Sequence, residues 1–332
     1  MVKLNLTSQI VLNKVPEEFY HPKTAVELSE LTRCEKIPTT IFPKSEEGAR
    51  SIANAIEKTI RQKQQSGQYC VLGLGTGSSL TPVFNELIRL HKEEGLSFSN
   101  VIVFNAYEYF PLQAGAKNST LNQLKERLLN HVDVNPQNVF SPEGTVPQER
   151  VQEFCRLYEQ RIQSFGGIDI MLLGIGRIGN IATNEPGSGL TSSSRIILID
   201  NLTREEMSMS QSTNETVPPC SVTMGISTIL KARKIYLTAW GEEKADIIQK
   251  TVEGPISDAI PASRPTDPHR ASLARHQLHL DRQAHTRSPG VALRGDRQAH
   301  PQAHQQGLQR ERPVGAAHHL RVGLQRQHQD IQ

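Results

Sequence analysis

The chain has 332 residues, of which 36% are apolar, 5% aromatic and 21% charged, and its formal net charge is +3. This length allows two or three domains, and no apolar run approaches the roughly 18 residues of a membrane span, which excludes a transmembrane protein. Four scattered cysteines without a Cys-x-x-Cys pair disfavour a disulfide framework or a zinc ribbon. The first residues show no apolar core of a signal peptide, so we expect a cytoplasmic protein.

The net charge hides a division of the chain near residue 263. Residues 264–332 contain eleven Arg, no Lys and five acidic residues, so this tail carries +6 and the remaining 263 residues carry −3. The tail also holds nine of the twelve His, eleven Gln and no aromatic residue. With so little to bury, it is predicted to be disordered. A basic arm for nucleic acid and a His-rich metal tract are alternatives, although the histidines are irregularly spaced.

A shifted reading frame also accounts for the composition of the tail. Gln codons read one base later give mainly Lys, Asn, Ser or Arg, and His codons give Ile, Thr or Met. A misread Lys- and Asn-bearing sequence would therefore become rich in Gln and His and free of Lys, as residues 264–332 are. We assign no function to the tail and expect neither a nucleic-acid partner nor a metal. The predicted organisation is a lead-in over residues 1–33, one folded domain over 34–263 and the tail over 264–332.

The folded domain alternates helical patterns with short apolar runs. Ser45, as an N-cap, with Glu46 and Glu47 in the first turn predicts a helix that continues to Gln65. Continuous apolar strands separated by helices predict an α/β fold, a doubly wound and mostly parallel sheet with helices on both faces. The predicted strands are 69–74, 101–105, 168–174, 195–200 and 234–240, and the further helices lie near 80–94, 119–131, 147–164, 224–232 and 242–252.

A glycine turn follows the first predicted strand, where ligands of parallel sheets bind. Residues 73–79 read Gly-Leu-Gly-Thr-Gly-Ser-Ser and open a helix. The glycines permit a tight turn, and the helix start offers N–H groups and a positive dipole end, which together predict a phosphate site. A turn that only packs is the alternative. The Gly-Lys-Ser/Thr of a nucleotide-hydrolysing loop is missing. The predicted ligand contacts are Gly75, Thr76, Gly77, Ser78 and Ser79.

Two further segments follow later strands. Residues 104–109 read Phe-Asn-Ala-Tyr-Glu-Tyr, and Glu108 is a candidate general base, with a loop-capping carboxylate as the alternative. Residues 174–179 match the Gly-x-Gly-x-x-Gly of dinucleotide sites. We reject that reading, because one Pro, two Gly and four Ser within 184–194 leave no crossover helix. The segment instead is expected to present Asn180 and Glu185 to a polar ligand.

Together these segments resemble the glucosamine-6-phosphate deaminase family over about residues 34–260. The resemblance implies an isomerase and hydrolase chemistry that opens the sugar ring, moves a proton from C2 to C1 and releases ammonia to leave fructose 6-phosphate. It implies no cofactor, an amino-sugar phosphate as partner and a possible homo-oligomer. It also implies ligand contacts from Gly176 and Lys244. The resemblance rests on the glycine turn, 104–109, Asn-His-Val-Asp at 130–133, Asn-Glu-Pro at 184–186, and Lys244 with Val-Glu-Gly at 252–254.

The sequence departs from the family pattern at the positions where the family has its proton-transferring side chains. The family Asp after Phe-Asn-x is Tyr107 here, and the family Asp and His of the later loop are Ile178 and Asn180. Neutral Tyr is a poor base, and Asn moves no proton. Glu185 keeps the position of the family Glu. The sequence thus leaves two main hypotheses: a deaminase whose base is Glu108, or a catalytically impaired sugar-phosphate-binding module. A lactonase or pentose-phosphate isomerase is a third.

The resemblance carries three further expectations. Some bacterial relatives join such a domain to a deacetylase-like domain, so the chain is expected to derive from a longer parent. The chain is expected to lack the final strand of the family after Ser263. A second phosphate-contacting Arg of the family falls near Met209 here, and Arg195 lies near an effector-site Arg of some relatives.

Overall fold

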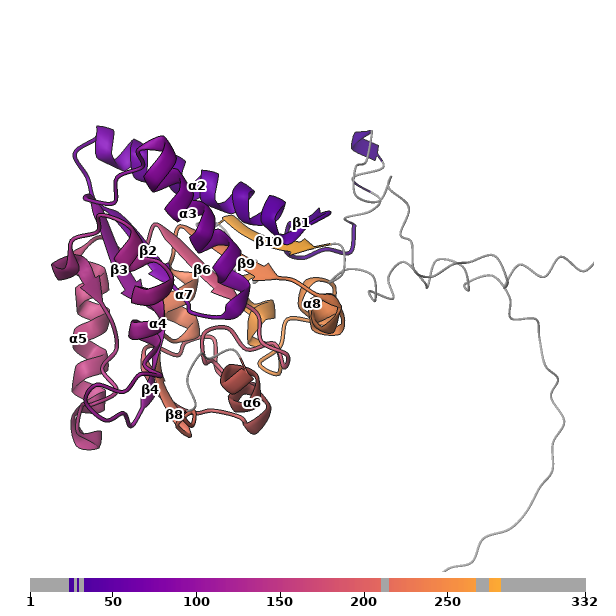
Figure 1. Cartoon of the computed structure of the whole chain (residues 1–332). Coiled ribbons are helices and arrows are strands. Elements are labelled where there is room, and N and C mark those ends of the chain that lie inside the picture. The colour runs from indigo at the N-terminus through magenta and orange to yellow at the C-terminus, as the bar shows by residue number, and fades with distance from the viewer. Residues whose placement is uncertain (1–23, 27–28, 30–32, 210–214, 267–274, 282–332) are drawn as a thin grey trace, which may run out of the picture. The chain divides into compact units, whose positions relative to one another are not determined.

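The computed structural model describes residues 24–26, 29, 33–209, 215–266 and 275–281 (Figure 1). These residues belong to the first of two units, residues 1–292, and the second unit, 293–332, lies outside the described residues. Most of the predicted lead-in and most of the predicted disordered tail therefore lie outside the described residues. In the part of the chain that is described, no helix is both long and apolar enough to cross a membrane.

The main sheet has seven strands, and every neighbouring pair is parallel. The predicted mostly parallel sheet is confirmed. Gly73 of β2 (Cys70–Leu74) pairs with Phe104 on one side and Met171 on the other, which fixes the register. In sheet order the strands are β1 (Thr39–Phe42), β10 (Arg275–Asp281), β9 (Lys234–Ala239), β6 (Ile170–Gly174), β2 (Cys70–Leu74), β3 (Val101–Asn105) and β5 (Val139–Phe140).

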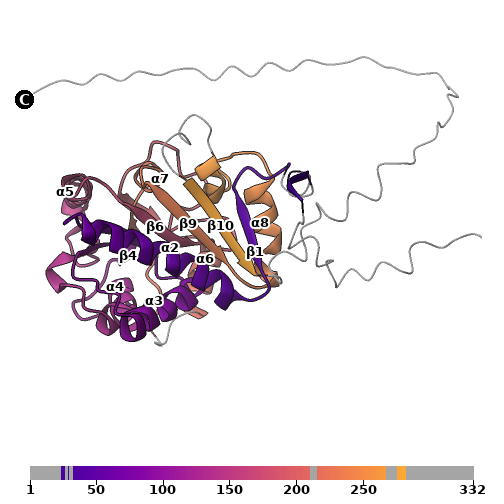
Figure 2. The same cartoon turned by 90° about the horizontal axis from the view of Figure 1, so that it is seen from above.

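Helices cover both faces of this sheet, as predicted (Figure 2). One face packs against α2 (Ser45–Gln65), α3 (Thr81–Glu94) and α4 (Thr120–Arg127). The opposite face packs against α5 (Val151–Ser164), α7 (Ile226–Leu230) and α8 (Ala245–Val252). The described residues also form short 3-10 helices: η3 (Ser78–Leu80), η4 (Leu129–His131), η5 (Pro136–Asn138), η6 (Gln148–Arg150), η7 (Glu242–Lys244) and η8 (Pro261–Thr266).

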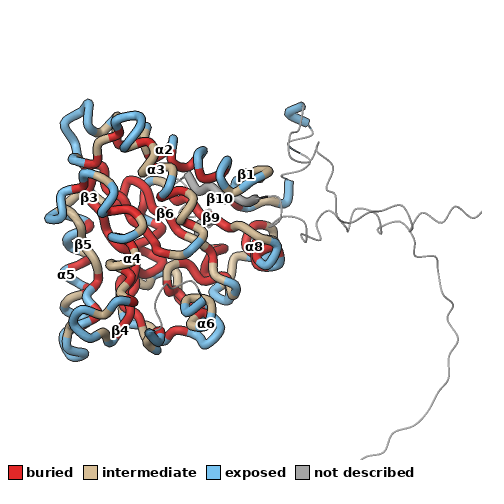
Figure 3. The backbone as a smooth tube through the Cα atoms, in the orientation of Figure 1, coloured by how far each residue is buried: buried red, intermediate tan, exposed pale blue. Residues whose placement is uncertain are grey.

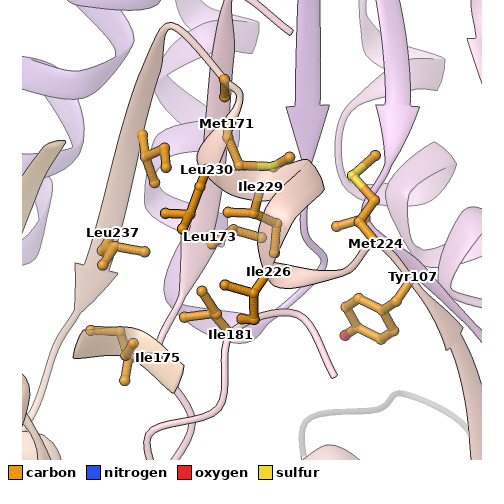
Figure 4. Close-up of a cluster of buried hydrophobic side chains, with 14 of the residues drawn as sticks. Tyr107, Met171, Leu173, Ile175, Ile181, Met224, Ile226, Ile229, Leu230 and Leu237 are labelled. Carbon is orange, nitrogen blue, oxygen red and sulfur yellow. The ribbon is translucent and has the colours of Figure 1, made fainter. Parts of the chain in front are cut away.

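Alternation along the strands separates two apolar cores. Leu72 and Leu74 pack on the side of α2 and α3, whereas Val71 belongs to the other cluster. This alternation follows from the two-residue period of a strand, whose successive side chains point to opposite faces. The buried residues run through the centre of the fold in Figure 3. Figure 4 shows the second cluster, in which Met171 and Leu173 of β6 face Ile226 and Ile229 of α7.

A second sheet differs from the prediction. The run 195–200, predicted as a strand of the main sheet, supplies β7 (Arg195–Leu198) of an antiparallel sheet with β8 (Cys220–Thr223) and β4 (Tyr107–Phe110). The segment before β7 contains no crossover helix, which is the usual connection between parallel strands, and β7 instead pairs antiparallel with β8. Ile196 and Leu198 are exposed, which fits a strand with one solvated face.

Several elements were not predicted: the strands β1, β4, β5, β8 and β10 and the helix α6 have no counterpart among the predicted elements. The sequence led us to expect no strand after Ser263, yet β10 lies between β9 and β1 and pairs with both. Strand pairing uses backbone groups, so polar composition does not prevent it, and Leu278 and Leu280 keep a two-residue alternation. The polar helix α6 (Asn201–Met209) was also missed, because only Thr203 within it is buried. The predicted cap of α2 is wrong by one residue, since Lys44 is its N-cap.

Candidate active site

A pocket of about 100 Å³ lies at the carboxyl ends of the parallel strands. Its walls come from the turn after β2, the start of β4, the loop after β6, η7 after β9, and α6. This is the expected position for a ligand of such a sheet. Of the predicted site residues, the pocket is lined by Gly75, Thr76, Gly77, Ser78, Ser79, Tyr107, Gly176, Asn180 and Lys244, and not by Glu108 and Glu185.

The glycine turn is fixed in place by its neighbours. Arg127 donates to the carbonyl of Thr76 over 2.7 Å, and the indole of Trp240 donates to the carbonyl of Ser79 over 2.6 Å. Gly174 permits the close approach of Ser79, because a Cβ at that glycine would lie 2.4 Å from Ser79 Oγ. The turn leads directly into η3 and α3, where the N–H groups of Leu80 and Thr81 already donate to the carbonyls of Gly77 and Ser78. The N–H groups of Ser78 and Ser79, which begin η3, are therefore those with no partner within the helix. This arrangement fits a bound anion, as the sequence predicted.

Tyr107, which the sequence resemblance aligns with the family Asp, forms part of the pocket wall. It is 6% exposed, and its phenol oxygen accepts a hydrogen bond of 3.0 Å from the Thr76 hydroxyl. Burial raises the pKa of Tyr107 above its ordinary value. The phenol therefore stays protonated near neutral pH, where it can donate a hydrogen bond but cannot act as a base.

Glu108 lies outside the pocket, on the opposite side of β4 from Tyr107. Its side chain is turned toward the start of α4, and the residue is 3% exposed. Burial raises its pKa, and the four donors around it act in the opposite direction. Glu108 thus closes the helix start, and a role as base has no geometric support. Its oxygens accept from the N–H groups of Tyr109, Thr120 and Leu121 and from the Ser119 hydroxyl, over 2.7–3.1 Å.

Asn180, which the sequence resemblance aligns with the family His, lines the pocket. It is 4% exposed, and its Oδ1 has no hydrogen-bond partner among the described residues. Gly176 makes room for this side chain, since a Cβ on Gly176 would lie 1.9 Å from Asn180 Oδ1. An amide here can bind polar atoms of a ligand, but it transfers no proton. Ile178, at the position of the family Asp, is not part of the pocket wall.

Glu185 lies behind the pocket wall and is 6% exposed. Its Oε2 accepts a hydrogen bond of 3.2 Å from Thr203, which does line the pocket. Its Oε1 is buried and has no partner within the part of the chain that the structure describes. Burial raises the pKa of Glu185 to about 7. Thr203 thus lies between the buried Glu185 carboxyl and the pocket.

We expect the stability of the protein to fall between pH 4.5 and 7 because of Glu185. Its folded pKa of about 7 exceeds its ordinary value of 4.5, so in this range the folded state binds a proton that the unfolded state has lost. The stabilisation is present below pH 4.5 and lost as the pH rises through 7, with a loss of about 2 kcal/mol after allowance for screening.

Urea unfolding at pH 5 and pH 8 measures this effect. The variant Glu185→Gln has no carboxyl to ionise, so it should be more stable than the unchanged protein at pH 8 and similar at pH 5. Glu205→Gln, on the exposed side of α6, is the matched control. An equal pH dependence in Glu185→Gln and in the unchanged protein would contradict the assignment.

Lys244 lies in the pocket, as the sequence predicted, but it is already paired. It is 9% exposed, and its Nζ contacts Oε1 of Glu206 from α6. Sequence analysis missed Glu206, Thr203 and Met207, all of which line the pocket. These residues lie on a polar helix with no motif, so no signal in the sequence pointed to them.

The described residues contain no group of three or more His, Cys, Asp or Glu side chains arranged to hold a metal ion. The charged side chains that line the pocket are Lys244 and Glu206, which form an ion pair. The remaining lining is glycine, hydroxyl, amide, aromatic and aliphatic. This arrangement can bind and orient a polar anionic ligand through N–H groups, hydroxyls and one ammonium.

Comparison with known proteins agrees with this geometry. Residues 43–275 match the family of glucosamine-6-phosphate isomerases/6-phosphogluconolactonases. A glucosamine-6-phosphate deaminase-like protein of Bacteroides thetaiotaomicron is 60% identical over 262 residues, which are 79% of this chain and 40% of that protein. The chain thus spans about two fifths of that relative. The glucosamine-6-phosphate deaminase of Shewanella woodyi is 41% identical over 67% of this chain and 82% of that protein.

Among solved structures, a monomeric glucosamine-6-phosphate deaminase is 34% identical to this chain. The similarity covers 75% of this chain and 98% of that one, with a TM-score of 0.68. The similarity therefore extends over nearly the whole of that smaller protein.

Proposed function

This chain belongs to the family of glucosamine-6-phosphate isomerases and 6-phosphogluconolactonases, and from that premise we propose that its pocket binds a sugar phosphate without deaminating it. One observation carries the proposal. The pocket is lined by the glycine turn and Lys244, and also by Tyr107 and Asn180, neither of which can take up a proton near neutral pH. The resemblance aligns these two residues with the proton-transferring Asp and His of the family.

The binding half of the proposal rests on the glycine turn. Ser78 is exposed at the pocket, and the N–H groups of the turn lead into η3. Phosphate oxygens accept hydrogen bonds from such N–H groups and hydroxyls, and the ammonium of Lys244 adds charge. Relatives of this chain are named glucosamine-6-phosphate deaminases. We therefore propose an amino-sugar phosphate as the ligand, with its sugar toward Tyr107 and Asn180.

The second part of the proposal, that the pocket does not deaminate its ligand, rests on the lack of a group that can transfer the proton. Moving a proton from C2 to C1 needs a base that is unprotonated near neutral pH and lies within hydrogen-bond reach of the substrate. Tyr107 stays protonated because burial raises its pKa, and Glu108 is outside the pocket with all four of its acceptor positions in use. A positioned base or acid typically supplies a 10²- to 10⁴-fold acceleration. The alternative of an active deaminase with Glu108 as its base is therefore the less supported one.

The test combines ligand binding with ammonia release for the full chain. We expect glucosamine 6-phosphate to raise the melting temperature by several degrees, because a ligand that binds only the folded state stabilises it. We expect ammonia release no faster than in a protein-free control, under conditions in which the deaminase of Bacillus subtilis releases it readily. Protein-dependent ammonia release would contradict the second part of the proposal, and absence of any thermal shift at millimolar ligand would contradict the binding half.

A further inference from the structure

A carboxylate of the protein itself occupies the anion-binding side of the pocket. Glu206 projects from α6, and its Oε1 contacts the Nζ of Lys244 on η7. The Glu206 side chain is 30% exposed and that of Lys244 is 11% exposed, so the pair is partly shielded from water. Both residues line the pocket that also contains the glycine turn.

The second oxygen of the same carboxylate is also engaged. Oε2 of Glu206 accepts a hydrogen bond of 3.1 Å from the backbone N–H of Arg177, in the loop after β6. Glu206 therefore joins an ammonium from one wall of the pocket to an N–H group from another. A lysine ammonium and a backbone N–H are also what a phosphate oxygen would use.

We propose that Glu206 is an intramolecular occupant of the anion site and that it determines how tightly the pocket binds phosphate. The inference rests on the proposed function, because it takes the ligand of the pocket to be phosphorylated. A phosphate that reaches Lys244 must displace the Glu206 carboxylate or accept it as a neighbour. Glu206 thus lowers the affinity of the pocket for a phosphate group.

Charge counting supports this assignment. With Lys244 and Glu206 paired, the charged side chains that line the pocket sum to zero. Like charges a few ångströms apart near a protein surface repel strongly, so a carboxylate beside a phosphate dianion weakens its binding. Met209 at the end of α6 is 81% exposed and offers no compensating charge.

Isothermal titration calorimetry on the full chain tests the proposal with glucosamine 6-phosphate and with unphosphorylated glucosamine. The variant Glu206→Gln keeps the shape of the side chain and removes its charge. We expect at least tenfold tighter binding of glucosamine 6-phosphate and no change for glucosamine. Glu205→Gln, one residue earlier on an exposed side of α6, should change neither. The double variant Glu206→Gln with Lys244→Met should lose the gain, and Glu206→Ser serves if Glu206→Gln fails to fold.

The outcomes separate this inference from the proposed function. Binding of the phosphate ligand with equal affinity by the unchanged protein and by Glu206→Gln would overturn the inference and leave the proposed function intact. Binding by Glu206→Gln alone would support the inference and contradict sugar-phosphate binding by the unchanged protein. If neither bound, both would fail, because freeing Lys244 and the Arg177 N–H would not have created an anion site.

Discussion

Replacing Glu108 by Gln is expected to lower the free energy of unfolding by about 3 kcal/mol, and thus to damage the fold rather than a reaction. The carboxylate accepts four hydrogen bonds, from three backbone N–H groups and the Ser119 hydroxyl. In Gln one of the two oxygens is replaced by an amide NH₂ group. That group is a hydrogen-bond donor, so it cannot accept from the donors that surround this position. Buried groups that lose their partners in this way typically cost 1–3 kcal/mol each.

Urea unfolding and ligand titration together measure this effect. Glu126→Gln, an exposed residue of α4, should be nearly neutral and is the control. Ser119→Ala removes one donor to Glu108 and the N-cap of α4, so it should destabilise by about 1 kcal/mol. If Glu108 were the base, Glu108→Gln would abolish turnover with little change in ligand affinity. That result, a stable variant that has lost ammonia release, would restore Glu108 as the base.

Replacing Lys244 by Met is expected to weaken the binding of glucosamine 6-phosphate by roughly 10- to 100-fold. Hydrogen bonds to charged groups contribute about 1.5–3 kcal/mol, and each 1.4 kcal/mol is a tenfold change in affinity. Two effects act in the same direction here. The phosphate loses the ammonium, and the Glu206 carboxylate loses its cationic partner and repels the ligand more strongly.

The same calorimetric titration measures the effect of Lys244→Met. Lys250→Met, on the exposed side of α8, removes an equal charge from a residue that does not line the pocket, and it should leave the affinity within about twofold. Unphosphorylated glucosamine should bind the Lys244→Met variant as it binds the unchanged protein. A similar loss for both sugars would mean that Lys244 supports the shape of the pocket and not the phosphate.

Local pattern was enough for most of the secondary structure. The helix predicted to follow a Ser45 cap and continue to Gln65 is α2, which begins one residue earlier, at Ser45, and the run 101–105 is β3 with the same bounds. Apolar periodicity along a helix and continuous apolar runs in buried strands are properties of neighbouring residues, so they can be read without the fold. The glycine turn and Lys244 also lie where the sequence placed them, because parallel strands bring their carboxyl ends to one edge.

The tertiary structure decided which side chains face the ligand space. Tyr107 and Glu108 are neighbours in the sequence, but successive residues of a strand point to opposite sides, so one lines the pocket and the other caps α4. The sequence does not say which side of β4 the pocket is on, since that depends on the pairing of β4 with β8 in a separate antiparallel sheet. Glu206 reaches Lys244 from a helix 38 residues earlier, and only the packing of α6 against the pocket brings their charges together. The sequence by itself therefore determined the family and the mostly parallel character of the main sheet, and it placed the glycine turn at the pocket. The orientation of β4 and the packing of α6, which arise from contacts distant in the sequence, decided the chemistry that the pocket can support.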